Sequence, residues 1–316
     1  MSERPAGGAS HSIAPELATI LRAMSVSHLR VRRLAGLRLL ISSSIAVAGA
    51  VITFSALSSI VVTVIGAVWA ATYAVGLASW ADGELRRAAL LQEMFEVKYF
   101  DLPWNSALVG EPVRVEDVNR LSKNYKSKRQ PASDWYGKPD SAEFPYPHDA
   151  LWKQEENLSW GGRIRHRYAN TILGVVTVWT VGGGALGAAV GLTIGQIILR
   201  WFVPSLGGLL LGLDSFRQQR GVVSERERVC RLAQNIHSLS DPRFYKASNG
   251  RVADAATVTQ LTVLARQLQD ILFLTRCRAP RVPSRLFYLR YYQEDRKDYE
   301  AAKEERAELI RRAATA

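Results

Sequence analysis

Two long stretches of this sequence restrict its fold more than any other feature, because they carry almost no charge. The first runs from Leu39 to Ala81 without a charged residue, and the second runs from Tyr168 to Leu213 with Arg200 as its single charge. A helix needs about 20 apolar residues to cross the hydrocarbon core of a bilayer. Each stretch is therefore long enough for two spans and a turn. One short apolar run would also suit a buried helix of a soluble protein, but runs in two consecutive pairs favour a membrane protein.

The expected fold class is an α-helical membrane protein with four transmembrane helices arranged as two hairpins. The first stretch is too long for a cleavable signal peptide and has a long arm before it. The insert and the C-terminal domain are predicted to be mainly α-helical. The expected regions are a basic cytoplasmic arm (1–38), the first hairpin (39–81), a cytoplasmic insert (82–169), the second hairpin (170–213) and a cytoplasmic C-terminal domain (214–316).

Local patterns predict the elements of the soluble regions. Apolar residues recur with helical spacing over 85–99 and over 258–272, which predicts one helix in each place. A last helix is expected over 284–312. The segment 101–159 is rich in Pro, Asp and aromatic residues, and we interpret it as an ordered loop with short elements, because its aromatic content argues against disorder.

The positions of arginine predict the orientation of the spans. The turn at 54–59 has no charge and the turn at 193–196 has only Arg200 nearby, whereas the opposite flanks carry several arginines. Cytoplasmic flanks are enriched in Lys and Arg, so both termini and the insert are expected in the cytoplasm. The net charge of +12 predicts contacts with anionic lipids, at about 1 kcal/mol for each basic residue near the surface. An anionic soluble ligand is the alternative.

Small residues in the second hairpin are expected to pack helices closely. Gly183, Gly187 and Gly191 lie four residues apart, and Gly208 and Gly212 repeat this spacing. Glycines on one face allow two helix backbones to approach each other in a membrane. The same pattern serves packing within one molecule and contact between copies. Both interpretations therefore stay open, and a homo-oligomer is expected.

The sequence contains no pattern typical of catalysis, of a cofactor or of a metal site. Its five histidines are scattered, and its two cysteines, Cys230 and Cys277, lack the neighbours of a metal site and are expected to be free thiols. Neither a GxxxxGK[ST] loop nor a GxSxG elbow is present. Arg200 is the only ionisable residue of the spans, which disfavours an ion-coupled carrier. We therefore expect a membrane protein that is not an enzyme.

Five short strings, in order around the two hairpins, resemble the SMODS-associating four-transmembrane effector family of bacterial anti-phage systems. The resemblance extends from the first hairpin to about residue 294. The strings are Phe-Asp-Leu-Pro-Trp-Asn (100–105), Asp-Trp-Tyr (134–136), Asn-Leu-Ser-Trp-Gly-Gly-Arg-Ile-Arg-His-Arg-Tyr (157–168), Leu-Gln-Asp-Ile-Leu-Phe-Leu-Thr-Arg (268–276) and Val-Pro-Ser-Arg-Leu-Phe-Tyr (282–288).

The resemblance implies a pore-forming effector of the bacterial inner membrane that senses a cyclic di- or trinucleotide. The nucleotidyltransferase that makes this messenger is implied as a functional rather than physical partner, and no direct binding of nucleic acid is expected. Aromatic side chains stack on bases and arginines pair with phosphates. The candidate ligand contacts are Trp135 and Tyr136 for stacking, with Arg163, Arg165 and Arg276 for phosphate.

Two alternatives remain open on the sequence alone. Trp135 and Tyr136 also suit core anchors of a loop-rich domain, and Arg163 and Arg165 suit anchors beside the membrane. The whole chain would also fit a non-pore membrane scaffold or receptor that recruits a cytoplasmic partner. A neighbouring gene for a nucleotidyltransferase would favour the effector, whereas a neighbouring gene for a signalling partner would favour the scaffold.

Overall fold

The computed structural model of this chain is built from helices. It describes residues 14–53, 60–72, 76, 78–126, 146–239 and 255–278, together with single positions between 282 and 304. No strand occurs within these described residues, in agreement with the predicted helical class. The helices are α1 (Pro15–Thr53), α2 (Ile60–Thr72), α3 (Ala78–Phe100), α4 (Ser106–Val109), α5 (Val115–Lys123), α6 (His148–Ala189), α7 (Ile194–Ile197), the π-helix η2 (Ile198–Phe202), α8 (Val203–Leu239) and α10 (Ala255–Arg278).

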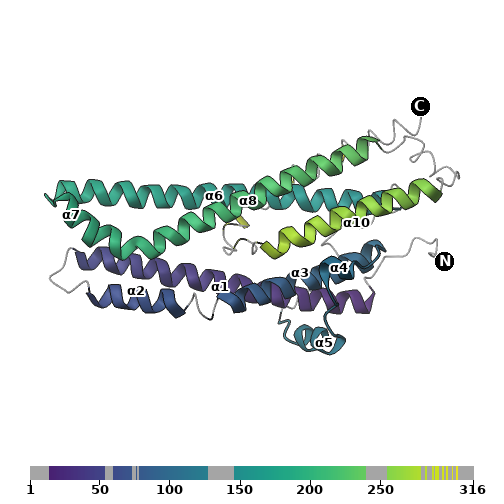
Figure 1. Cartoon of the computed structure of the whole chain (residues 1–316), viewed down its shortest axis with the longest axis horizontal. Coiled ribbons are helices and arrows are strands. Elements are labelled where there is room, and N and C mark those ends of the chain that lie inside the picture. Colours follow the sequence, from purple (N-terminus) through teal and green to yellow (C-terminus); the bar gives the residue numbers. More distant parts are fainter. Residues whose placement is uncertain are drawn as a thin grey trace.

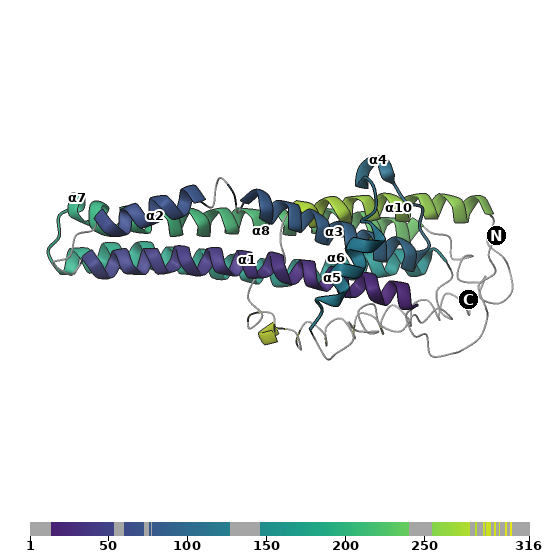
Figure 2. The ribbon, with the colours of Figure 1, turned by 90° about the horizontal axis from the view of Figure 1, so that it is seen from below.

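These helices form an elongated bundle (Figure 1). Helices α1 and α6 run along most of its length, α8 packs against both, and α2 and α3 follow one another beside α1. Figure 2 shows α2 and α7 near one end and α5 and α10 toward the other. We call residues 39–72 and 170–213 the apolar half of the bundle, and the remaining described residues the core half.

The core half contains a continuous hydrophobic core. Helices α1, α3, α6, α8 and α10 each contribute to it, for example with the buried side chains of Leu21, Phe95, Leu158, Val229 and Leu268. Burial of one Leu, Val or Phe side chain stabilises a fold by about 1.5–3 kcal/mol. A cluster to which these five helices and α5 contribute therefore holds this half together as it would in a soluble helical domain.

The apolar half presents its large hydrophobic side chains outward instead. One residue from each of α1, α2, α6 and α8 illustrates this: Val51, Val68, Val178 and Leu210 are 62%, 61%, 73% and 57% exposed. Soluble proteins seldom expose a continuous apolar surface of this kind, whereas lipid covers one in a membrane. By length and composition, α6 and α8 each contain a segment that could cross a bilayer.

The structure confirms two helices that the spacing predicts. The helix expected over 85–99 lies within α3, where Leu85 and Phe95 are buried. The amphipathic helix expected over 258–272 is α10, whose residues Leu261 and Leu268 enter the core. Of the last expected helix, only single positions are described, and those between Phe287 and Glu304 are helical.

Two expectations for the soluble regions differ from the structure. Residues 15–38 are not a separate arm, because they form the first part of α1 and bury Leu21 and Met24 in the core. The loop expected over 101–159 ends earlier than predicted, since α6 begins at His148 and buries Leu151. Both differences have one cause, which is that apolar residues at helical spacing stand among charged and aromatic neighbours that conceal them.

The helices continue through the positions that we expected to divide the chain. Helix α1 runs past residue 38, α3 past 81, α6 past 169 and α8 past 213. The division into five regions therefore stays a prediction of which residues lie in the membrane and which in the cytoplasm, and it does not correspond to the ends of helices. The second expected span corresponds to α2 and the beginning of α3, with residues 73–75 and 77 outside the described residues.

Candidate functional site

Glycines of the second hairpin lie where α6 meets the returning chain. A Cβ atom added to Gly183 would overlap the indole of Trp201, and one added to Gly187 would approach Ile197 Cγ1 to 2.6 Å. Real Cβ atoms do not come so close to a neighbour, so glycine is required for this packing as the structure has it. Both residues therefore serve contacts within the hairpin.

Two glycines of α8 complete this packing. A Cβ at Gly212 would lie 2.6 Å from Val176 Cγ2 of α6, and one at Gly208 would lie 3.3 Å from Ala46 Cβ of α1. Gly208 therefore packs the second hairpin against the first. Gly191 lies outside this face, because it follows the end of α6 and has a φ of 74° in the turn. Glycine is favoured at position 191 because it adopts this left-handed backbone conformation without strain, and not because another helix packs closely against it.

Each hairpin contains a hydrogen bond from a tryptophan to a serine of the other helix. Trp69 Nε1 donates to Ser42 Oγ at 3.2 Å, between α2 and α1. Trp179 Nε1 donates to Ser205 Oγ at 3.0 Å, between α6 and α8, and its ring stacks on Trp201 with centroids 4.8 Å apart. A polar group in an apolar medium needs such a partner. These bonds therefore fix the pairing of helices in the apolar half.

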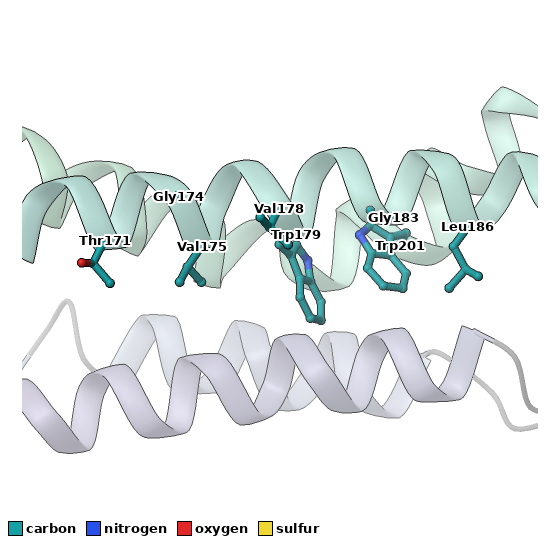
Figure 3. Close-up of a pocket in the computed structure, with 9 residues that line it drawn as sticks. Thr171, Gly174, Val175, Val178, Trp179, Gly183, Leu186 and Trp201 are labelled. Carbon is teal, nitrogen blue, oxygen red and sulfur yellow. The ribbon is translucent and has the colours of Figure 1, made fainter.

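A shallow apolar groove of about 770 Å³ runs along α6 beside this tryptophan pair. Figure 3 shows Thr171, Val175 and Leu186 in a row along α6, with the indoles of Trp179 and Trp201 beside each other. The lining is almost entirely apolar, so the groove suits hydrocarbon rather than a charged ligand. Arg200 lies in η2 next to Trp201, close to the turn, where an exposed arginine can reach the polar face of a membrane.

The core half contains a buried network of charged and amide side chains between α3 and α10. The guanidinium of Arg276 binds both oxygens of Glu96, with Nη1 at 2.5 Å from Oε2 and Nη2 at 2.9 Å from Oε1. Gln269 Nε2 donates to the same Glu96 at 2.6 Å and to Glu93 at 2.8 Å. Arg266 binds Glu93, and also Asp270 at 2.6 Å. The network therefore joins two helices through paired charges.

This network is far from solvent, and burial changes the acidity of one member. The Glu93 and Glu96 side chains have no exposed surface, and those of Arg266 and Arg276 are 9% and 7% exposed. Burial raises the pKa of the Glu93 carboxyl above its ordinary value, although the charge and hydrogen bond of Arg266 oppose the shift. Such charges are tolerated inside a protein only when they are paired.

The candidate arginines occupy different surroundings. Arg276 belongs to the buried network just described. Arg165 of α6 is buried, donates to Gln219 of α8 at 2.7 Å, and has its pKa lowered to about 10 by burial. Arg163 is exposed on α6. Trp135 and Tyr136 lie outside the described residues, and the hydrogen-bond partners described above for Arg165 and Arg276 are different side chains, Gln219 and Glu96.

The buried network was not predicted from the sequence, although its residues stand at positions that indicate it. Glu93 and Glu96 stand inside the apolar run of α3, and Arg266 and Gln269 stand inside that of α10. Charges on the inner face of an amphipathic helix indicate buried pairs rather than a solvated surface. Within the part of the chain that is described, no group of three or more His, Cys, Asp or Glu side chains could hold a metal ion.

C-terminal positions also contact α6, beside the candidate arginines. The ring of Tyr168 meets that of Phe287 with centroids 5.5 Å apart. The guanidinium of Arg167 lies 4.6 Å from the ring centroid of Tyr291 and 3.3 Å from Glu294. This side of α6 is therefore covered by the end of the chain at the described positions.

Comparison with known proteins gives a consistent assignment. The family model described as the SMODS-associating 4TM effector domain matches residues 10–306. A protein of Bacillus cereus (strain VD146), named as a probable CBASS effector molecule, is 22% identical over 236 residues, which cover 74% of each chain. No solved structure matches the chain. Since the family model spans almost the whole sequence and the motifs point the same way, this chain belongs to the SMODS-associating 4TM effector domain family.

Proposed function

We propose that this chain is the membrane effector of an anti-phage system of the CBASS type, and that it permeabilises the bacterial inner membrane when a cyclic nucleotide binds its cytoplasmic domains. The family description and the name of the Bacillus relative support the role of effector. In this proposal the messenger is a cyclic di- or trinucleotide made by a separate nucleotidyltransferase. The chain itself performs no chemistry.

The observation that carries the proposal is the division of one continuous bundle into two halves. Helices α1, α6 and α8 begin or end in the buried core of one half and continue into the other, where apolar side chains face outward. A long helix transmits a shift at one end to its other end without an intervening joint. Binding at the core half can therefore act on the apolar half directly, as a signalling effector requires.

The proposed topology has four spans, with both termini and the insert in the cytoplasm. The outward-facing residues of α1 and α2 support two spans in the first hairpin, beside the two in α6 and α8. The core half would then lie below the inner leaflet, where its basic residues meet anionic lipids. Several copies would assemble to enclose a pore, since the groove along α6 of one chain is lined almost entirely by apolar residues.

Among the candidate contacts, the exposed Arg163 and the aromatic pair Trp135 and Tyr136 are proposed to bind the messenger. Arg165 and Arg276 could take part only if the ligand displaced Gln219 or Glu96 from them. Loss of a partner would leave a buried charge uncompensated, which costs about 3–5 kcal/mol. Among the three arginines, the exposed Arg163 is therefore the better one to test first.

The test is to measure the membrane potential with a voltage-sensitive dye in cells that make the chain alone, or with an active or inactive nucleotidyltransferase. We expect depolarisation only with the active enzyme. Purified chain in liposomes should release an entrapped dye when a matching member of a panel of cyclic di- and trinucleotides is added. An intact potential and sealed liposomes across the panel would instead favour a scaffold that recruits a partner.

A further inference from the structure

A small polar cavity lies in the core half, where α1, α3 and α5 meet. Its volume is about 210 Å³. This is below the 300–1,000 Å³ of pockets that enclose a whole drug-sized ligand, so the cavity suits one charged group of a larger molecule. Its lining residues are Arg30 of α1, Arg87 of α3, and Asp117, Arg120, Leu121 and Asn124 of α5 and its C-terminal end.

Three arginines from three different helices meet at this cavity, and two carboxylates stand beside them. Arg87 Nη1 lies 2.8 Å and Arg30 Nη1 3.9 Å from the same oxygen of Glu84, while Arg120 Nη2 lies 2.6 Å from Asp117 Oδ1. The group therefore carries one more positive than negative charge. A guanidinium has five N–H donors, so these contacts leave donors for a further acceptor.

The arginines are accessible, which separates them from those of the buried network. Their side chains are 37%, 46% and 76% exposed for Arg30, Arg87 and Arg120. The buried Leu121 anchors α5 in the core beside the cavity. Planar guanidinium groups bind phosphate oxygens through paired hydrogen bonds better than a single point charge does. An accessible concave surface with three of them matches the chemistry of a phosphate group.

We propose that this cavity binds a phosphate group and thereby joins α5 to α1 and α3. The inference deepens the proposed function, because the phosphate would belong either to the cyclic nucleotide or to an anionic lipid. Arg30 precedes Arg38, the last charge before the first apolar stretch, by eight residues of helix or about 12 Å. At this distance from the apolar stretch, both a soluble nucleotide and a lipid headgroup can reach the cavity, so the experiment must distinguish the two sources.

The experiment uses the full chain in nanodiscs and inorganic pyrophosphate as the probe, at constant ionic strength. The thermal unfolding midpoint is followed by tryptophan fluorescence, because a ligand of the folded state raises it. We expect pyrophosphate to raise the midpoint of the wild-type chain. Arg120→Gln should weaken the apparent affinity about tenfold, since it removes a charge-assisted contact, and adding Arg30→Gln should abolish the shift.

Arg114→Gln is the matched control. It removes the same charge at the start of α5, but Arg114 does not line the cavity and its side chain makes no capping bond there. Its pyrophosphate affinity should equal that of the wild type. No shift in the wild type, or equal weakening by Arg120→Gln and Arg114→Gln, would overturn the site, because general electrostatic attraction would then be sufficient.

Discs of phosphatidylcholine with and without phosphatidylglycerol separate the two sources. If the headgroup occupies the cavity, phosphatidylglycerol will raise the midpoint of the wild-type chain but not of Arg120→Gln, and it will reduce the pyrophosphate shift. If the nucleotide occupies it, the pyrophosphate shift will be equal in both discs. A chain that depolarises cells but shows no shift overturns this site alone, and a chain with the shift but no depolarisation overturns the proposed function alone.

Discussion

Replacement of Arg276 by methionine tests whether that arginine holds the core half together. Methionine has a similar length and no charge, so the change leaves Glu96 buried without its bidentate partner. Glu96 would keep hydrogen bonds from Gln269 at 2.6 Å and from Gln92 at 2.9 Å. Amide donors carry no net charge, and they compensate a buried carboxylate only in part. The carboxylate must then be protonated or the helices must separate.

The expected cost follows from the burial of the pair. The side chains of Arg276 and Glu96 are 7% and 0% exposed, and removal of one partner from such a pair costs about 3–5 kcal/mol. Because Glu96 keeps the hydrogen bonds from the amide groups of Gln269 and Gln92, we expect the cost of Arg276→Met to lie near the lower end of this range. For a chain of this size, about 2 °C of unfolding midpoint corresponds to each kcal/mol. The midpoint in detergent should therefore fall by about 6 °C or somewhat more.

Two further variants make this measurement decisive. Arg228→Met removes an arginine from the exposed pair with Glu225 and should change the midpoint little, because solvent screens such pairs. Exchange of the pair, Glu96→Arg with Arg276→Glu, should recover part of the lost stability if the role is structural, because it restores the ion pair although Gln269 and Gln92 lose their acceptor. An unchanged midpoint for Arg276→Met would refute the reasoning. A stable exchange variant that no longer responds to the messenger would show that Arg276 also contacts the ligand.

Three more predictions follow from the packing, the topology and the pKa. Gly183→Ala should destabilise the fold by about 1–3 kcal/mol through overlap with the indole beside it, whereas Gly182→Ala, whose Cβ meets no atom within 4 Å, should not, as measured by thermal unfolding in detergent. Reporter fusions at Ala316 and near Lys128 should give cytoplasmic signals, and a periplasmic signal at either place would contradict the topology. Burial raises the pKa of the Glu93 carboxyl in the folded chain, so the stabilisation that comes from protonating it is fully present below about pH 4.3, the pKa of an unperturbed Glu, and is lost as the pH rises through the higher pKa of the folded chain. The unfolding midpoint should therefore fall between these two pKa values as the pH rises, and Glu93→Gln should make this fall smaller.

The long-range features of the fold were the harder ones to predict. The apolar stretches and the helices α3 and α10 could be predicted, because each is encoded by the spacing of apolar residues within its own segment. The pairing of Glu96 with Arg276 joins residues 180 positions apart, and no local period encodes it. For the same reason the glycine pattern predicted close packing but not its partners, which are Trp201 for Gly183 and Ala46 for Gly208. The family itself was predictable, because its motifs are short strings that can be recognised in the sequence without knowing which residues are in contact.

The N-terminal region shows a different limit. Residues 15–38 carry Arg22 and Arg30 among apolar neighbours, and a count of charges there indicates a basic arm. In the structure Leu21 and Met24 face the core from the same helix. Apolar side chains can enter a core between charged neighbours of the same helix, so the average charge of a segment conceals them. Arg30 thereby lines the cavity between α1, α3 and α5 rather than belonging to a separate basic arm.

The size of the required response limits what a single cavity can do. To shift an effector from 1% to 99% in the active arrangement, a ligand must favour that arrangement by about 5.5 kcal/mol. Three accessible guanidinium groups at about tenfold each supply at most about 4 kcal/mol, and solvent screening reduces that figure. One phosphate in the cavity of Arg30, Arg87 and Arg120 is therefore insufficient for a complete switch. A messenger that gates this protein must make further contacts outside the cavity, or several copies of the chain must add their contributions in one assembly.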